Sequence, residues 1–533
     1  MKKILLLLLG LVLIVSCGGK SGSKLKGKTV TFNVEAEPTS LDPQLLTDMG
    51  GFMISNATYE NVVRLNEKNE IVPAGAESYT VSPDGKIWTF KLRKNAKWSN
   101  GDPVLAKDYV NGIKRGLEPK LASEYAYMAY YIKGAEDFNT GKTTDFSTVG
   151  VTAPDDYTVV YELSKPAAYF GKTLILPIFA PVNTKALEQF KDKYATEASN
   201  SIYNGPYKMI EWVHDNKAVL VKNENYWNKD NIKIDNLVAM MTPDFDAAVS
   251  MYQNGEMDLT KISNEKIDIF KGKPDLQVHA DGRVFYFGFN VTDDILKNIK
   301  VRKALSLAID RNKLISDVLR NGSFIGSGLV ANGTPGTSGD FREENGNLYD
   351  QYKTEDVKKL FEEGLKELGK TPADVKLTLA IDEKGSAKKE AEYFQAQWQE
   401  KLGIKVNIES TTYKIRLEKG KNYDYQIIRY AWGPDYADPM TYLELLYSKS
   451  GAINITKYNN KEYDKLIELA QVNNDNAVRM DAMKKAEKIA TEEFFYSGLY
   501  YESANYAVNP KIKNVVIRAV GAPIDFYYAD LSE

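Results

Sequence analysis

Two carboxylates and two large aromatic side chains stand close together at residues 432–439, which read Trp-Gly-Pro-Asp-Tyr-Ala-Asp-Pro. One glycine and two prolines favour a bent backbone over a helix. A carboxylate placed among aromatic rings suits the binding of an organic cation such as an amino group. The alternative is a surface turn in which the aspartates cap helices. The segment alone leaves both interpretations open.

The residues on either side of this segment predict the elements that position it. Residues 425–431 form an apolar run typical of a buried strand, and residues 440–447 favour a helix. Asp438 directly precedes Pro439 at the start of that helical run, so we expect it to be a helix N-cap. Gly433 and Pro434 are then expected to shape the turn that presents Asp435.

The N-terminus has the pattern of a secretory signal. Lys2 and Lys3 precede a 12-residue apolar run, whereas a membrane-spanning helix needs about 20 apolar residues. The run ends next to Cys17, the only cysteine of the chain, so no intramolecular disulfide can form. The pattern resembles the lipobox of bacterial lipoproteins, which implies a signal peptide at 1–16, lipidation of Cys17 and a flexible tether at 17–27. A plain signal peptide with an incidental cysteine and a membrane anchor are the alternatives.

The composition argues against several function classes. Lys and Arg number 69 against 72 Asp and Glu, so no strong field favours nucleic acid. The two histidines stand outside any motif with metal-ligand spacing, and the sequence contains no phosphate-binding loop or nucleophile elbow. We therefore expect neither an enzyme nor a cofactor. No later segment of the sequence is apolar enough to predict a membrane span.

Strand-like and helix-like segments alternate along the whole chain, which predicts an α/β protein with mixed sheets. A Pro83-Asp84-Gly85 turn predicts a hairpin over 78–92, and apolar residues at helical spacing predict a helix over 301–309. Further strands are expected at 29–34, 157–163, 219–221, 283–289, 375–381 and 406–409, and further helices at 106–113, 353–368, 390–401, 461–470 and 478–491.

Several short motifs, in order, resemble the peptide-binding branch of the bacterial extracellular solute-binding proteins of family 5, the receptors of oligopeptide, dipeptide and nickel ABC importers. The matching pieces cover almost the whole mature chain. They are residues 37–43, 59–61, 73–77, 82–85, 97–103 with 106–108, 204–207, 225–227, 301–305 and 432–439.

This resemblance implies a two-lobed periplasmic-binding-protein-like fold with a hinge and an extra inserted domain. Lobe 1 would comprise 28–62, 188–287 and 504–533, the inserted domain 63–187, and lobe 2 residues 288–503. It also implies that a monomer binds short peptides in the interlobe cleft and delivers them to a permease with its ATPase. The protein would be anchored by lipid in the cell envelope, in the periplasm or on the outer face of the cytoplasmic membrane.

The resemblance also suggests site residues. Asp435 matches the aspartate that pairs with the ligand's α-ammonium group. Arg429 stands where some peptide binders carry an arginine for a ligand carboxylate, although a structural ion pair is the alternative. In place of a glutamate of the enteric receptors, this chain has Gly51, with Asp48 nearby. The other expected ligand-binding residues are Trp432, Gly433, Tyr436, Tyr413, Tyr125, Tyr127, Tyr286 and Asn454.

Two groups of alternatives remain from the sequence. The protein could be a receptor for dipeptides only, a nickel chelate, haem or another small solute. It could also be a surface or sensory lipoprotein that keeps the fold without import.

Overall fold

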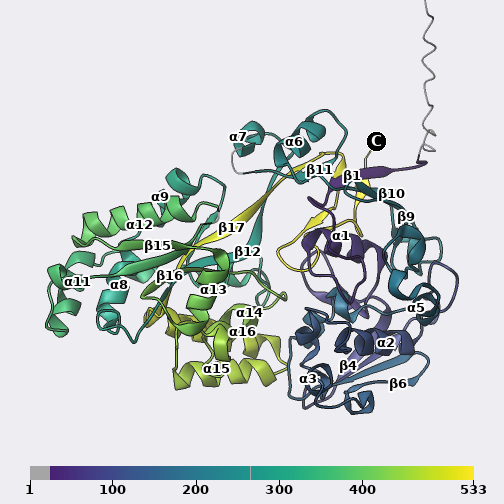
Figure 1. The fold of residues 1–533 in the computed structure, drawn as a ribbon, viewed down its shortest axis with the longest axis horizontal. Coiled ribbons are helices and arrows are strands. Elements are labelled where there is room, and N and C mark those ends of the chain that lie inside the picture. Colours follow the sequence, from purple (N-terminus) through teal and green to yellow (C-terminus); the bar gives the residue numbers. More distant parts are fainter. Residues whose placement is uncertain (1–24, 264–265, 384, 533) are drawn as a thin grey trace, which may run out of the picture.

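The computed structural model describes residues 25–263, 266–383 and 385–532. They form two lobes connected by two long antiparallel strands, β12 (Leu276–Phe289) and β17 (Tyr496–Val508), which run from one lobe into the other (Figure 1). This is the two-lobed α/β architecture that the sequence predicts. The predicted signal peptide, Cys17 and residues 18–24 of the predicted tether lie outside the described residues.

One sheet of 11 strands extends through both lobes, with β12 and β17 at its centre. Parallel and antiparallel pairs both occur, so the sheet is mixed as predicted. The lobe 1 strands follow the order β11 (Leu259–Lys261), β1 (Thr29–Asn33), β10 (Asn236–Met240), β9 (Lys217–Lys222) and β8 (Tyr207–Val213). The lobe 2 strands are β16 (Ile427–Trp432), β14 (Thr378–Asp382), β15 (Asn407–Thr411) and, beside β17, the short β13 (Phe324–Ile325).

Lobe 2 has its own apolar core between its strands and helices. Val301, Ala304 and Leu305 of α8 are fully buried in it, as their helical spacing predicts, together with Trp398 of α12. The lobe contains α8 (Ile299–Leu307), α9 (Arg311–Lys313), α10 (Phe341–Asn345), α11 (Val357–Glu367), α12 (Ala387–Leu402), α13 (Tyr413–Asn422), α14 (Met440–Leu443), α15 (Lys461–Val472) and α16 (Asn476–Glu492).

The segment 63–187 contains a separate sheet of four strands, in the order β4 (Ala76–Val81), β5 (Ile87–Leu92), β7 (Thr158–Glu162) and β6 (Val151–Asp155). The predicted hairpin is β4 and β5, and Gly85 takes the left-handed conformation (φ 70°) that its turn requires. Its helices are α2 (Ala106–Leu117), α3 (Ala135–Asn139), α4 (Phe170–Thr173) and α5 (Thr184–Phe190), the last of which extends past residue 187.

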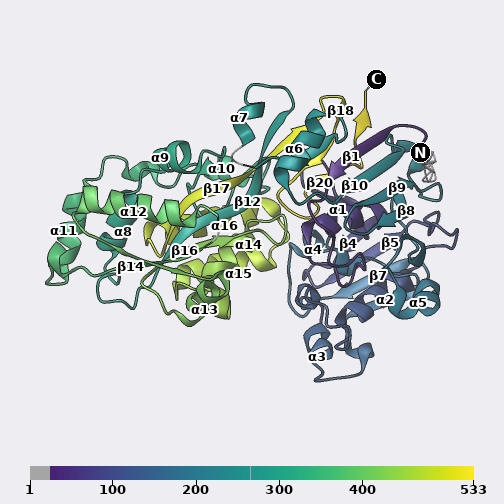
Figure 2. The ribbon, with the colours of Figure 1, turned by 45° about the horizontal axis from the view of Figure 1, so that its top comes forward.

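Lobe 1 is completed by three helices and the end of the chain. The helices are α1 (Met49–Thr58), α6 (Phe245–Gln253) and α7 (Ile267–Phe270). After β17 the chain returns to this lobe, where the C-terminus lies near the start of the described chain (Figure 2). None of the helices in the described ranges is long and apolar enough to span a bilayer.

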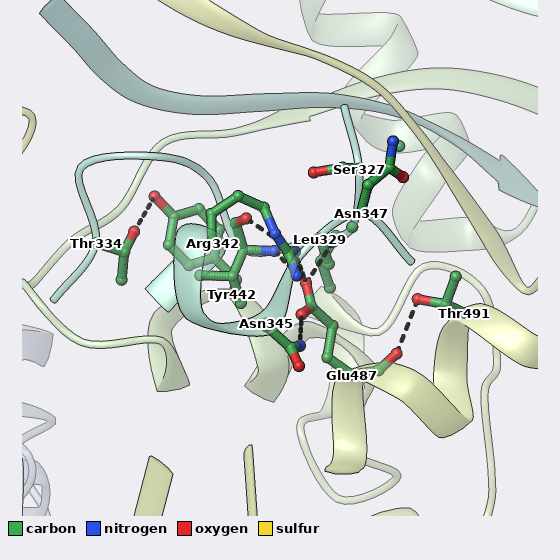
Figure 3. Close-up of polar contacts among 12 residues, drawn as sticks. Ser327, Leu329, Thr334, Arg342, Asn345, Asn347, Tyr442, Glu487 and Thr491 are labelled. Atoms are coloured by element: carbon green, nitrogen blue, oxygen red, sulfur yellow. Dashed lines mark hydrogen bonds and ion pairs between the residues drawn. The ribbon is translucent and has the colours of Figure 1, made fainter. Parts of the chain in front are cut away.

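A buried charge cluster fixes lobe 2 beside the interlobe strands (Figure 3). Glu487 of α16 accepts hydrogen bonds from Arg342 (2.7 Å), Asn345 (2.6 Å) and the backbone N–H groups of Leu329 and Val330. These contacts hold their surroundings in one arrangement, because breaking the pair with Arg342 would leave the buried Glu487 charge uncompensated.

The helix predicted over 440–447 is shorter than expected. It consists of α14 followed by one 3-10 turn at Glu444–Leu446. Tyr442 of α14 donates a hydrogen bond to the carbonyl oxygen of Gly282 in β12 (2.6 Å). The 432–439 segment, α14 and the interlobe strand are therefore connected directly.

Candidate functional site

A cavity of about 820 Å³ lies between the lobes. Lobe 1 contributes residues 33–37 after β1 and the first half of α1, while the C-terminal segment contributes residues 518–524. The interlobe strands and the inserted domain supply further walls, and lobe 2 contributes Gly433, Pro434 and Asp435. The cavity therefore brings together segments that are far apart in the sequence. Part of the 432–439 segment lines it.

Asp435 lies at the cavity with a carboxylate that lacks a partner. Its backbone N–H donates a hydrogen bond to the Thr441 hydroxyl (3.1 Å), which holds the turn against α14. Within the described ranges, no hydrogen bond or ion pair reaches the carboxylate itself. Partial burial without a partner raises its pKa to about 6. A cation entering the cavity would compensate this charge.

Two tyrosines of the inserted domain face Asp435. Tyr125 lines the cavity, and its ring stacks on that of Tyr127 with centroids 6.0 Å apart. Desolvation and then the charge of Asp435 raise the pKa of both hydroxyls. Aromatic rings beside a carboxylate are well suited to an organic cation. Asp435 and Tyr125 both line the cavity, whereas Tyr127, stacked on Tyr125, lies outside the lining; their roles in ligand binding stay predictions of the resemblance.

Asp438 connects lobe 2 to the inserted domain. Its fully buried carboxylate binds Arg479 through two contacts (2.9 and 3.0 Å) and Lys172 of α4 through one (2.9 Å). It also accepts the N–H of Met440 (3.1 Å), but Pro439 occupies the N-cap position of α14. The expected capping role is therefore secondary to these ion pairs. Burial alone would raise the pKa of Asp438, but Arg479 and then Lys172 hold it below its ordinary value.

Tyr436 belongs to the same contact between the lobes and does not line the cavity. Its buried ring stacks on Tyr169 of the inserted domain, with centroids 5.0 Å apart and planes 5° from parallel. Its hydroxyl donates to Glu444 (3.0 Å). This packing places Tyr436 away from the cavity lining, so the ligand-binding role expected for it stays a prediction. Burial raises the pKa of Glu444 to about 7, with a smaller contribution from Asp435.

Three charged residues that line the cavity were not predicted from the sequence. Arg283 of β12 contacts Glu502 of β17 (2.8 Å) and, more distantly, Asp281 (3.9 Å), and all three line the cavity. Three features mark this position. Gly282, with φ 74°, interrupts an otherwise strand-like run, and the register of β12 on β17 shifts there. Glu502 is also the only charged residue of β17.

Three expected ligand-binding residues lie inside the protein. The Arg429 guanidinium is buried against Glu390, with two contacts of 2.7 Å, so its alternative interpretation as a structural ion pair applies. Tyr286 is buried among tyrosines of neighbouring strands. The buried Asn454 side chain donates a hydrogen bond from its amide nitrogen to the backbone carbonyl oxygen of Tyr458 (2.9 Å). None of the three lines the cavity, because each side chain is oriented into the fold.

Trp432 and Tyr413 lie outside the cavity lining as well. Trp432 ends β16, is partly buried and packs against the core. Tyr413 begins α13, is 43% exposed, and lies under the guanidinium of Arg416 (5.0 Å). Within the described residues, no group of three or more His, Cys, Asp or Glu side chains could hold a metal ion.

Comparison with known proteins identifies the family. The model of the bacterial extracellular solute-binding proteins, family 5, matches residues 70–454. The chain belongs to this family. A dipeptide-binding protein of Bacillus subtilis, DppE, is 34% identical over 96% of this chain and 94% of its own length. The oligopeptide-binding protein OppA of the same organism is 31% identical over 97% and 96%.

Solved structures of the family confirm the fold and distinguish two arrangements of the lobes. The murein tripeptide-binding protein MppA in an unliganded open form has a TM-score of 0.86 at 28% identity, covering 95% of this chain and 98% of its own. Peptide-bound OppA of Listeria monocytogenes has a TM-score of only 0.68 at 32% identity, covering 96% and 100%. The lobes of this protein thus resemble the open arrangement more than the peptide-bound one.

Proposed function

We propose that this protein is the substrate-binding receptor of an ABC peptide importer and that it binds short oligopeptides between its lobes. The observation that carries the proposal is the partly buried Asp435 carboxylate, which has no partner among the described residues and lines, together with Tyr125, a cavity of about 820 Å³. Leaving such a carboxylate without a partner costs free energy, which an α-ammonium group would recover. The family relatives named for dipeptide and oligopeptide binding support this assignment.

In the proposed mechanism a peptide enters the open cleft with its amino end toward Asp435. Charge-assisted hydrogen bonds from the ammonium group to this carboxylate fix the first residue. The main chain lies extended along the cavity, and its side chains are accommodated there, some of them through water. Closure of the lobes about β12 and β17 then creates the shape that the permease binds. Chemistry on the peptide is not part of this mechanism.

The localisation is part of the proposal. Cys17 would carry the lipid anchor, and the following residues would tether the two lobes to the outer face of a membrane. A solved relative from Bacillus anthracis is named as the substrate-binding domain of an oligopeptide ABC transporter. The permease and ATPase would therefore be the partners of this chain.

Native mass spectrometry can test the function, because it identifies whatever molecule the protein retains. The protein is purified without denaturation, and its bound molecules are released and identified. The proposal predicts a mixture of short peptides with free amino ends, which exchange with added tri- to pentapeptides. Recovery of a nickel chelate or haem, together with no uptake of added peptides, would contradict it.

A further inference from the structure

The cavity has an unequal charge balance. Among the described residues, its lining contains six carboxylate side chains against three cations, Lys261, Arg283 and Arg518, an excess of three formal negative charges. The chain as a whole carries almost no net charge per residue, with a total of −3 over 533 residues. A cleft with low-dielectric walls concentrates such a local excess and raises the local concentration of cations.

Two of the three cations each lie near one carboxylate. Arg518 contacts the buried carboxylate of Asp525 behind the cavity wall (3.0 Å). Lys261 lies 3.9 Å from Glu35. Asp525 is shared with Arg64 (3.4 Å), and Lys261 and Glu35 both keep part of their side chains exposed to the cavity.

The third cation, Arg283, has two carboxylate neighbours. Arg283 lies between Glu502 (2.8 Å) and Asp281 (3.9 Å). A ligand carboxylate that approached this guanidinium would also meet two like charges, and like charges at close range oppose binding.

Three lining carboxylates have no Lys or Arg within 4.0 Å among the described residues. They are Asp435, Asp48 and Glu37. Asp48 accepts hydrogen bonds from Thr39 and the N–H of Gly51, which leaves its charge in place. Glu37 contacts the exposed ring of His214 (2.7 Å). The α-ammonium group of a ligand would balance only Asp435.

We infer that this cleft selects peptides with a positively charged side chain in addition to the amino end, and that Glu35 is a residue that determines this selectivity. Glu35 follows β1, lines the cavity and keeps a side chain 44% exposed, with only the distant contact to Lys261. Its backbone has φ 71°, a conformation that costs free energy for any residue except glycine. The sequence nevertheless places a carboxylate here. The inference rests on the proposed function, because it concerns the same cavity.

Three matched tripeptides test the charge preference: Ala-Lys-Ala, Ala-Met-Ala and Ala-Glu-Ala. Their affinities are measured by isothermal titration at low and at physiological ionic strength. We expect the lysine peptide to bind at least tenfold more tightly than the glutamate peptide, with a ratio that falls as salt is added. Equal binding of all three, or tighter binding of the glutamate peptide, overturns the inference but leaves the proposed function standing. Absence of binding by all three, together with release of a non-peptide ligand, counts against both.

Two variants with opposite expected effects on this affinity ratio then test the role of Glu35. Glu35→Gln should reduce the lysine-to-glutamate affinity ratio several-fold, whereas Lys261→Gln should increase it. Glu224→Gln is the matched control, since Glu224 is 72% exposed and lies outside the cavity lining. Circular dichroism verifies that each variant is folded. An unchanged ratio in both cavity variants overturns the assignment of Glu35.

Discussion

Lys172 of the inserted domain and Asp438 of lobe 2 form an ion pair across the boundary between the lobes, with Nζ and Oδ2 2.9 Å apart. Asp438 is fully buried and Lys172 largely so. Next to this pair, Tyr169 stacks on Tyr436. Because Asp435 directly precedes Tyr436, the inserted domain helps to position the carboxylate that we assign to the ligand amino group.

Removing the charge of Asp438 should destabilise the protein strongly. Asp438→Asn leaves Arg479 and Lys172 without their carboxylate, and an uncompensated buried charge costs about 3–5 kcal/mol. Lys172→Met should cost less, because Arg479 remains as a partner of Asp438. Urea unfolding measures both effects. Lys142→Met, which removes an exposed ion pair, is the control, and about 0–1 kcal/mol is expected for it.

The pKa of Asp438 is lowered, so its stabilising contribution is present above about pH 4 and is lost as the pH falls further. A negligible effect of Asp438→Asn would contradict the assigned contacts.

Removing the charge of Asp435 should stabilise the ligand-free protein, whereas removing the charge of Asp438 should destabilise it. Its folded pKa of about 6 exceeds the unfolded value of about 3.9, so between these pH values the folded state binds more protons. The free energy of unfolding should therefore fall as the pH rises from about 4 to 6 and then level off. Asp435→Asn removes this loss, and we expect the variant to be more stable at pH 7 by about 1–3 kcal/mol.

Thermal and urea unfolding at pH 4 and pH 7 measure this effect. The two proteins should differ far less at pH 4, where Asp435 is protonated in the folded state. Asp294→Asn, at a position where the side chain is 85% exposed, serves as control. A variant less stable than the parent at pH 7 would show that the carboxylate has a structural partner.

Arg429 should matter for stability and not for ligand binding. Arg429→Met leaves Glu390 buried without its cation, which we expect to cost about 3–5 kcal/mol of unfolding free energy. Adding Glu390→Gln should restore part of this loss, because the uncompensated charge is removed. Calorimetric titration of the folded double variant should give the parent peptide affinity. A large loss of affinity with intact stability would support the ligand role that the resemblance suggested.

Gly282 should be required at the bend of β12. A Cβ atom there would lie 2.9 Å from both Pro434 and Ala519, and φ is +74°. Gly141 has a similar φ of +77°, but a Cβ atom there would have no neighbour within 4 Å. Gly141→Ala therefore measures the cost in unfolding free energy of the left-handed backbone alone, about 1–2 kcal/mol. We expect Gly282→Ala to cost more and to weaken peptide binding, since Pro434 must move. Equal effects of the two substitutions would contradict a steric role for this contact.

The fold was predictable where local pattern and packing agree. The spacing of Val301, Ala304 and Leu305 predicted α8, and the turn at Gly85 predicted the hairpin of β4 and β5. The joining of both lobes into one sheet of 11 strands was not predictable in this way, because β12 and β17 pair across more than 200 residues of intervening sequence. Long-range pairing of this kind leaves little trace in local periodicity.

The candidate site was predictable in part. Asp435 stood out through its unusual neighbours, and Tyr125 and Tyr127 followed from the family resemblance. The burial of Arg429 and Tyr436 was not predictable, because the sequence does not reveal side-chain direction; in β16, which contains Arg429, successive side chains point to opposite faces. The Arg283–Glu502 pair was missed because its members come from two strands that meet only in the folded protein.

The most direct test of the account is a double-mutant cycle between Asp435 and the amino end of a peptide. Calorimetric titration compares the parent protein and Asp435→Asn, each with Ala-Lys-Ala and its N-acetylated form. We predict that acetylation or Asp435→Asn alone costs about 2–5 kcal/mol of binding free energy, and that the second change adds little to the first. If the parent protein binds the acetylated peptide as tightly as the free one, Asp435 does not bind the amino end and the central claim is wrong.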